Sequence, residues 1–201
     1  MTFDAEHPDR PTESGVQERL LDLLDREAIR ATFFLQGRWI EAWPSTARRV
    51  AEAGHVVGNH SHYHVRMPLL SAAGFAIDVR RAERVIGDVV GADPRPWFRL
   101  PFGTGAGEAA VHRRLERLGY RHVHWDVNAE EWQVAAIEAQ VAEEIVRGVL
   151  ERGDGAVVLL HAWPRTLLGA LDAAAGRLRD AGARFVGIDE LESLPSGLGS
   201  P

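Results

Sequence analysis

The sequence contains no cysteine and no lysine, so all 23 of its basic residues are arginine. The lack of cysteine excludes disulfide bridges, thiolate zinc sites, iron–sulfur clusters and cysteine nucleophiles. The lack of lysine excludes a Schiff-base lysine, a P-loop lysine and a carboxylated lysine that bridges metals. Nine histidines are present, so metal or proton-transfer chemistry in this chain has to rely on histidine and carboxylate side chains.

The chain also lacks long apolar runs and a surplus of basic residues. A membrane-spanning helix needs a run of about 18 or more apolar residues, and the sequence contains none. Its 29 acidic residues outnumber the 23 basic ones and give a net charge of −6, so we expect no nucleic-acid partner. Residues 1–7 are too polar for a signal peptide. We therefore expect a cytoplasmic protein as the sequence stands, or a secreted or cell-wall protein if the natural chain begins further upstream.

Short β-rich runs alternate with longer amphipathic helical patterns. Several of the runs are almost wholly apolar, as in parallel strands that are covered on both faces. Glycines follow most of the helical patterns, where a left-handed C-cap lets the chain turn into the next strand. The expected strands span 2–4, 31–35, 55–58, 97–100, 122–127, 156–161 and 184–188, and the expected helices span 16–30, 45–53, 71–90, 108–118, 137–150 and 166–181.

This alternation predicts an α/β fold with a parallel sheet. A closed barrel and an open sheet share the pattern, and in both of them active residues lie at the carboxyl ends of the strands. We expect one domain over residues 1–193, followed by a flexible C-terminal tail at 194–201 that is rich in proline, glycine and serine.

Three histidines lie within five residues after the third expected strand, in the sequence Gly-Asn-His-Ser-His-Tyr-His at 58–64. A helical turn would place His60 and His64 on one side, whereas an extended segment would place His60, His62 and His64 on one face. Neutral imidazoles and a carboxylate together form a catalytic type of zinc site, with one position open for water. A solvated polar loop would explain the same residues without a metal.

Other reactive side chains also end or follow expected strands. Asp4 and Glu6 lie at the end of the first strand, where one carboxylate could bind a metal and the other take a proton from water. Arg99 lies in the fourth strand, and a buried arginine needs an acidic partner. Glu131 lies in an acidic loop between two tryptophans, and His161 ends the sixth strand. Each of these has a simple structural explanation when taken alone: a turn, an ion pair, a solvated loop or a core histidine.

Together and in this order, the motifs resemble those of the NodB-type polysaccharide deacetylases, carbohydrate esterase family 4. The family motifs Thr-Phe-Asp-Asp, His-Ser/Thr-x-x-His, Arg-x-Pro-x-Gly, Asp-Trp and Leu-x-His are similar to residues 2–4, 60–64, 99–103, 131–132 and 159–161, with Glu131 in place of the aspartate of the fourth motif. The resemblance extends from residue 2 to about residue 191. It implies a distorted (β/α) barrel of about seven parallel strands.

The resemblance further implies metal-assisted removal of an N-acetyl group from an amino sugar or a polysaccharide that contains N-acetylglucosamine. The expected cofactor is one divalent ion, Zn²⁺, and the expected partner is the carbohydrate substrate. The implied roles are a general base at Asp4, held by Arg99; a general acid at His161, tuned by Glu131; metal ligands at His60 and His64; an oxyanion contact from the backbone N–H of Phe102; and a methyl pocket walled by Trp132 and Leu159.

The chain departs from the family at residue 5, where Ala5 replaces a metal-binding aspartate. In a branch of the same superfamily the first motif is similar to Asp-x-Asp/Glu, in which the first acid is the base and the second is the metal ligand. Asp4 and Glu6 fit that spacing. Positions two apart in an extended segment also project to the same side. We therefore expect Glu6 to be the third metal ligand. The competing hypothesis reverses the two roles, with Asp4 on the metal and Glu6 as the base.

Two other functions fit parts of the sequence. An amidohydrolase-type metal hydrolase would use the pair His60-x-His62, but that class places such a pair after the first strand and often uses a bridging lysine, which this chain lacks. A non-catalytic sugar-binding relative would explain Ala5 through the loss of metal affinity. Peptidoglycan, chitin oligomers, a surface polysaccharide and a small amino sugar all carry the N-acetyl group, and the sequence does not choose among them.

Overall fold

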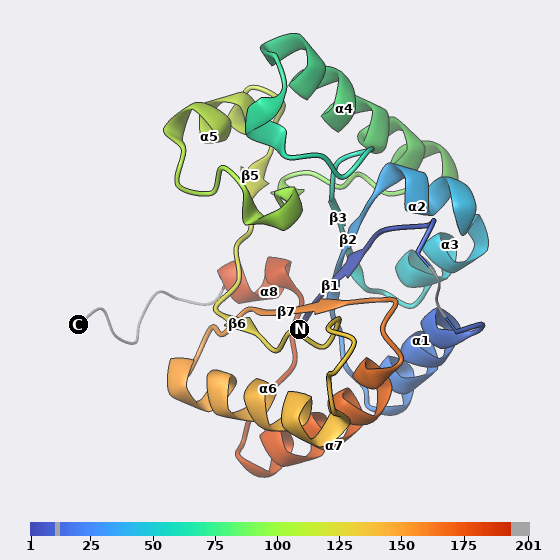
Figure 1. Cartoon of the computed structure of the whole chain (residues 1–201), viewed down its shortest axis with the longest axis vertical. Coiled ribbons are helices and arrows are strands. Elements are labelled where there is room, and N and C mark those ends of the chain that lie inside the picture. Colours follow the sequence, from blue (N-terminus) through green and yellow to red (C-terminus); the bar gives the residue numbers. More distant parts are fainter. Residues whose placement is uncertain (11–12, 194–201) are drawn as a thin grey trace.

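Seven short parallel strands form one curved sheet, in the order β5-β4-β3-β2-β1-β7-β6 (Figure 1). The structure is a computed structural model that describes residues 1–10 and 13–193, so the tail expected at 194–201 lies outside the described residues. β5 and β6 are the two edges of the sheet, which leaves the barrel open between them. The expected distorted barrel of about seven parallel strands is confirmed. The strands are β1 (Thr2–Ala5), β2 (Thr32–Leu35), β3 (Val56–Asn59), β4 (Trp97–Phe98), β5 (Arg121–His122), β6 (Val127–Asn128) and β7 (Val158–His161).

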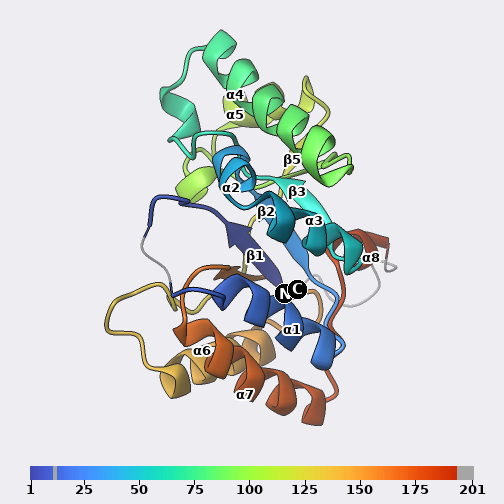
Figure 2. The ribbon, with the colours of Figure 1, turned by 90° about the vertical axis from the view of Figure 1, so that its right-hand side faces the viewer.

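The helices form an outer layer around this sheet (Figures 1 and 2). α6 and α7 lie side by side at one end of the molecule, and α4 and α5 lie at the other. No helix in the described part of the chain is long and apolar enough to cross a membrane. The helices are α1 (Val16–Arg26), α2 (Gly37–Ala42), α3 (Pro44–Glu52), α4 (Ala72–Val85), α5 (Ala109–Glu116), α6 (Glu138–Arg152), α7 (Thr166–Asp180) and α8 (Ile188–Ser193).

Two of the expected strands are wrong. The run at 122–127 is divided between β5 and β6, which lie at opposite edges of the sheet. Residues 183–187 form no strand, and α8 begins at Ile188. The N–H of Ile188 donates to Oγ1 of Thr32, 3.0 Å away, and Asp189 pairs with Arg30, so this segment is fixed by side chains at the amino end of β2. It therefore packs against the amino end of β2 instead of joining the sheet.

The alternation of side chains along β1 separates the apolar core from the interior of the barrel. Phe3 and Ala5 are fully buried in the main core, where the Phe3 ring stacks on Phe33 at a centroid distance of 4.9 Å. Thr2 and Asp4 point the other way and contact an arginine inside the barrel. Successive strand residues face opposite sides, so polar groups at positions 2 and 4 reach the interior while the intervening residues hold the strand to the helices.

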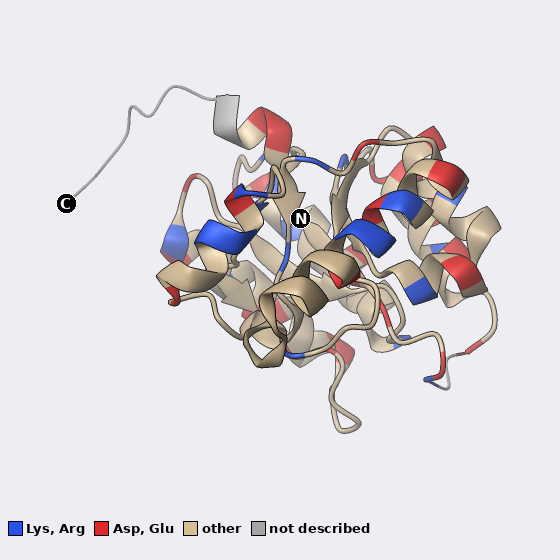
Figure 3. Cartoon of the chain, turned by 90° about the horizontal axis from the view of Figure 1, so that it is seen from above, with Lys and Arg blue, Asp and Glu red and all other residues tan. Residues whose placement is uncertain are grey.

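Arginines and acidic residues are interspersed over the helices (Figure 3). Ion pairs such as Arg49 with Asp22 and Arg177 with Glu143 link them. Because such exposed pairs contribute only about 0–1 kcal/mol each, the fold depends on its buried groups.

Gly58 provides a test of the packing between β2 and β3. A Cβ atom at this position would lie 2.7 Å from the ring of Phe34, which is opposite Gly58 in the sheet, and 3.2 Å from Cβ of Trp97. Neither neighbour has room to move, since both are buried. We expect Gly58→Ala to lower the free energy of unfolding by roughly 1–3 kcal/mol in a denaturant titration, as overpacked cores do.

The control is Gly176→Ala in α7, where an added Cβ meets nothing within 4 Å. Alanine is the better helix former, so this variant should be more stable by about 0.5–1 kcal/mol. A Gly58→Ala protein as stable as the wild type would contradict the packing described here.

Candidate active site

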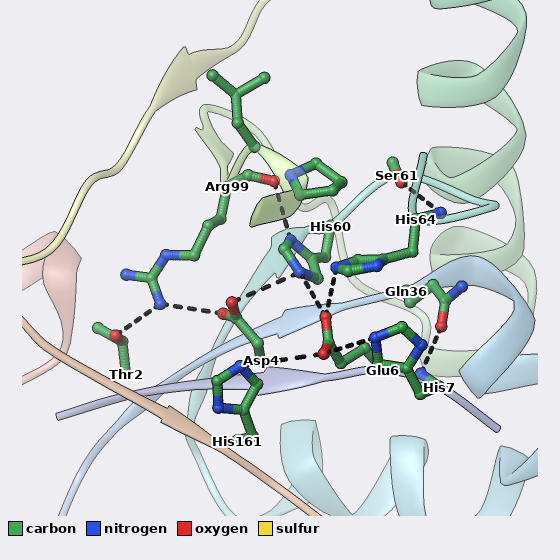
Figure 4. Close-up of polar contacts among 12 residues, drawn as sticks. Thr2, Asp4, Glu6, His7, Gln36, His60, Ser61, His64, Arg99 and His161 are labelled. Atoms are coloured by element: carbon green, nitrogen blue, oxygen red, sulfur yellow. Dashed lines mark hydrogen bonds and ion pairs between the residues drawn. The ribbon is translucent and has the colours of Figure 1, made fainter. Parts of the chain in front are cut away.

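The carboxyl ends of the parallel strands bring six of the expected site residues together: Asp4, Glu6, His60, His64, Arg99 and His161 (Figure 4). Asp4 lies in β1, and Glu6 is the first residue after that strand. His60 is the first residue after β3, and His161 is the last residue of β7. Asp4 and His161 are direct neighbours in the register of β1 and β7, so their side chains face the same way. The site thus lies where a parallel sheet places reactive groups.

Glu6, His60 and His64 form a buried group, the metal group, that could hold a metal ion. Oε2 of Glu6 lies 3.1 Å from Nε2 of His60 and 2.5 Å from Nε2 of His64. One donor atom from each residue lies within 4.8 Å of the others, and no second histidine–carboxylate group in residues 1–10 and 13–193 meets this condition. All three side chains are buried, which rules out a solvated polar loop as the explanation of these histidines.

The donor set fits a divalent cation such as Zn²⁺. Nδ1 of His60 lies 2.9 Å from the carbonyl oxygen of Arg99. A carbonyl only accepts hydrogen bonds, so Nδ1 carries a proton whether the ring is charged or neutral. In the charged ring Nε2 also donates, to Glu6, whereas in the neutral ring Nε2 has the lone pair that could bind a metal. Metal-binding histidines are commonly oriented by this kind of contact, and two imidazole nitrogens with one carboxylate are a known catalytic zinc set.

Side-chain acceptors shape the loop that carries the two histidines. Oδ1 of Asn59 accepts from the N–H of Ser61 at 2.8 Å, and Oγ of Ser61 accepts from the N–H of His64 at 3.0 Å. Buried Asp78, in α4, accepts from the N–H groups of His62 at 2.9 Å and Tyr63 at 3.2 Å. These contacts turn the chain so that His60 and His64, four residues apart, reach Glu6 together.

His62 is turned away from the metal group. Its ring is fully buried against the start of α2, where a Cβ on Gly37 would lie 2.2 Å from Nδ1 of His62. A side chain at position 37 would therefore displace the ring. The extended arrangement with His60, His62 and His64 on one face is not the one adopted, because Ser61 and His64 have left-handed backbone conformations.

Arg99 is fully buried and holds Asp4. Its Nη1 donates to Oδ1 of Asp4 at 3.0 Å and to Oγ1 of Thr2 at 2.8 Å, and its Nε donates to the carbonyl of Val123 at 3.3 Å. The Phe34 ring lies 4.1 Å beneath the guanidinium. Burial lowers the pKa of Arg99, and the charge of Asp4 opposes this. Oδ2 of Asp4 is left 3.5 Å from Nε2 of His60, outside the metal group.

Glu131 reaches His161 in spite of its extra methylene. Its Oε1 accepts from the backbone N–H of His161 at 2.6 Å and lies 2.9 Å from Nδ1 of the same residue. Glu130, directly before Glu131, has a left-handed backbone conformation with a φ of 52°. Burial lowers the pKa of His161, but the hydrogen bond and charge of Glu131 outweigh it and raise that pKa to about 9. A pKa of about 9 keeps the ring protonated at neutral pH.

The electrostatics keep the Glu6 carboxylate ionised. Burial acts to raise the pKa of Glu6, but hydrogen bonds from His60, His64 and His7 hold it well below its usual value. Burial lowers the pKa of His60, and the charges of Asp4 and Glu6 reverse that shift. Burial is also the main reason why the pKa of His64 is lowered.

Of the three expected substrate contacts, Phe102 lies against the group formed by Glu6, His60 and His64. Phe102 has a left-handed φ of 58°, is half exposed, and its ring lies 4.4 Å from that of His64. Leu159 is buried and lies two residues before His161, on the same side of β7. Trp132 is partly exposed and directly follows Glu131.

Sequence reasoning missed two residues that support the site. His7 contacts Glu6 directly, and Gln36 accepts a hydrogen bond from the His7 backbone. The only signal in the sequence was that His7 directly follows Glu6. The residue type does not indicate the left-handed conformation that turns His7 inward.

The polysaccharide deacetylase family model matches residues 1–123, more than half of the chain. The chain belongs to the polysaccharide deacetylase family. The matched part contains Asp4, Glu6, both metal-group histidines and Arg99, and it ends before Glu131 and His161.

Relatives in this family include enzymes and a pseudoenzyme. The peptidoglycan-N-acetylglucosamine deacetylase PgdA of Listeria monocytogenes is 31% identical over 95% of this chain, which corresponds to 38% of its own length. The family 4 carbohydrate esterase of Streptomyces lividans, solved with acetate, is 30% identical, with a TM-score of 0.81 over 96% of this chain and 92% of that one. A CE4 family pseudoenzyme of Bacillus anthracis is 25% identical, with a TM-score of 0.83 over 94% of this chain and 63% of that one.

The metal group can be tested by thermal denaturation. Because an ion that binds only the folded state stabilises it by about 2.7 kcal/mol at a hundredfold excess over its Kd, Zn²⁺ should raise the Tm of the metal-free protein by roughly 5–10 °C. His60→Ala and His64→Ala should remove most of this rise. His124→Ala, a change at an exposed histidine outside the group, should keep it. If Zn²⁺ raised the Tm of the wild type and of all three variants equally, the ion would bind elsewhere.

Proposed function

We propose that this chain is a metal-dependent deacetylase that hydrolyses the N-acetyl group of an amino sugar or of a glycan containing N-acetylglucosamine. The observation that carries the proposal is the order of groups in the site. The buried set Glu6, His60 and His64 lies beside two further groups: a carboxylate fixed by Arg99 and, next to that carboxylate across the pairing of β1 and β7, an imidazole fixed by Glu131.

Glu6, His60 and His64 would hold a divalent ion, with Zn²⁺ the best fit to their donor atoms. When bound, such an ion supplies Lewis acidity to an amide carbonyl and to water. Asp4 is the proposed general base. Its Oδ1 is engaged by Arg99, so Oδ2 remains to accept a proton on the side of His60.

His161 is the proposed general acid. An amine is a poor leaving group unless it is protonated, so the reaction needs a donor beside the scissile bond. Glu131 engages Nδ1 of His161, which leaves Nε2 facing the site, 3.9 Å from Oε1 of Glu6. With a pKa of about 9, the ring carries its proton at neutral pH.

The remaining groups complete the proposed substrate site. The backbone N–H of Phe102 would stabilise the negative oxygen of the tetrahedral intermediate. Trp132 and Leu159 would enclose the acetyl methyl group. The Listeria monocytogenes relative is a peptidoglycan-N-acetylglucosamine deacetylase, which makes N-acetylglucosamine oligomers the first substrates to test.

A non-catalytic sugar-binding role is the second candidate, favoured by the likeness to a CE4 pseudoenzyme and by Ala5. Two observations support catalysis instead. Ala5 is packed in the core, and Glu6 places a carboxylate beside the two histidines. The family match also favours a deacetylase over an amidohydrolase-type enzyme.

Acetate release from chito-oligosaccharides distinguishes these functions. The Zn²⁺-loaded wild type should release acetate. Asp4→Asn and His161→Ala should each lower kcat by roughly 10²–10⁴-fold, the usual contribution of a general base or acid, while binding Zn²⁺ as the wild type does. His124→Ala should leave kcat unchanged. A metal-loaded wild type that binds the oligosaccharide and releases no acetate would refute the deacetylase and establish the sugar-binding role.

A further inference from the structure

His7 lies against two members of the metal group (Figure 4). Its Nε2 is 3.0 Å from Oε1 of Glu6, and its ring meets that of His64 edge to face at a centroid distance of 4.6 Å. The side chain of His7 is 27% exposed, whereas that of Glu6 is 6% exposed. The His7 ring therefore covers the carboxylate on its solvent side.

The backbone of His7 is what turns the ring inward. In an extended chain, side chains at positions 6 and 7 would point to opposite faces. His7 instead has a φ of 55°, a left-handed conformation that is unfavourable for a residue with a side chain.

Gln36, the residue between β2 and α2, holds this conformation. The Oε1 atom of buried Gln36 accepts from the N–H of His7 at 2.9 Å, and the N–H of Gln36 donates to the carbonyl of Ala5 at 3.0 Å. The segment that carries Glu6 is therefore fixed on both sides of that residue.

The two oxygens of Glu6 have different partners. Oε2 faces His60 and His64, and Oε1 faces His7. A glutamate has one more rotatable bond than an aspartate, so its carboxylate needs an additional contact to keep one orientation. The donor atoms of His7 lie outside the group of three that could share an ion.

We propose that His7 is a positioning residue that orients the Glu6 carboxylate for metal binding through a hydrogen bond from Nε2 to Oε1. This inference rests on the metal site of the proposed function. It explains how a carboxylate at position 6, on a longer side chain, can replace one at position 5.

The test is the Kd of Zn²⁺ for the purified metal-free protein, measured by competition with a chelator and without substrate. His7→Gly removes the ring and tolerates the left-handed backbone, and it should weaken Zn²⁺ binding about 10–100-fold, as the loss of a group that orients a ligand does. His7→Gln keeps an N–H donor at the end of its side chain and should recover most of that affinity. His124→Ala should bind as the wild type does.

Denaturant unfolding of each metal-free variant shows whether it is folded before the titration. A folded His7→Gly protein with the wild-type Kd would overturn the inference. A loss that His7→Gln fails to recover would also overturn it, because the ring would then be acting as a ligand itself. A wild type that binds Zn²⁺ but releases no acetate would refute the proposed function alone and leave the role of His7 intact.

Discussion

The site depends on one cation without access to solvent, the guanidinium of Arg99. A buried charge is tolerated only when its hydrogen bonds and its counter-charge are supplied by the protein. Here Asp4 supplies the counter-charge, and Asp4, Thr2 and the carbonyl of Val123 accept from Nη1 and Nε, while the buried Nη2 has no hydrogen-bond partner among the described residues. Breaking such a pair by removing one partner typically costs roughly 3–5 kcal/mol, so Arg99 supports the fold as much as the chemistry.

The backbone of Arg99 links this ion pair to the metal group. Its carbonyl oxygen accepts from Nδ1 of His60, and its side chain orients Asp4. The same residue thus sets the tautomer of one candidate ligand and the direction of the adjacent carboxylate. The two halves of the site share a support, and a displacement of β4 would disturb both.

The placement of the motifs could be predicted from the sequence because it follows from general rules. Parallel strands bring their carboxyl ends to one edge, and residues two apart in a strand face one side. The latter rule accounts for Ala5. Position 5 faces the apolar core, as Phe3 does, so the interior receives its carboxylates from positions 4 and 6.

What could not be predicted depends on single long-range contacts. Residues 184–188 have the composition of a strand, and short apolar runs do not by themselves decide the secondary structure. Their path is decided by the bond from Ile188 to Thr32. The inward turn of His7 depends in the same way on Gln36. The likeness to both active and inactive relatives shows that this fold alone does not specify catalysis.

Asp4 and His161 are partners in the register of two hydrogen-bonded strands. Neighbouring strands lie about 4.8 Å apart, so the distance between the main chains of the proposed proton acceptor and donor is a property of the peptide ladder. Side-chain substitutions can change which groups occupy the two positions, but they cannot widen the span. The backbone therefore fixes the separation from which the acceptor and donor side chains reach into the site.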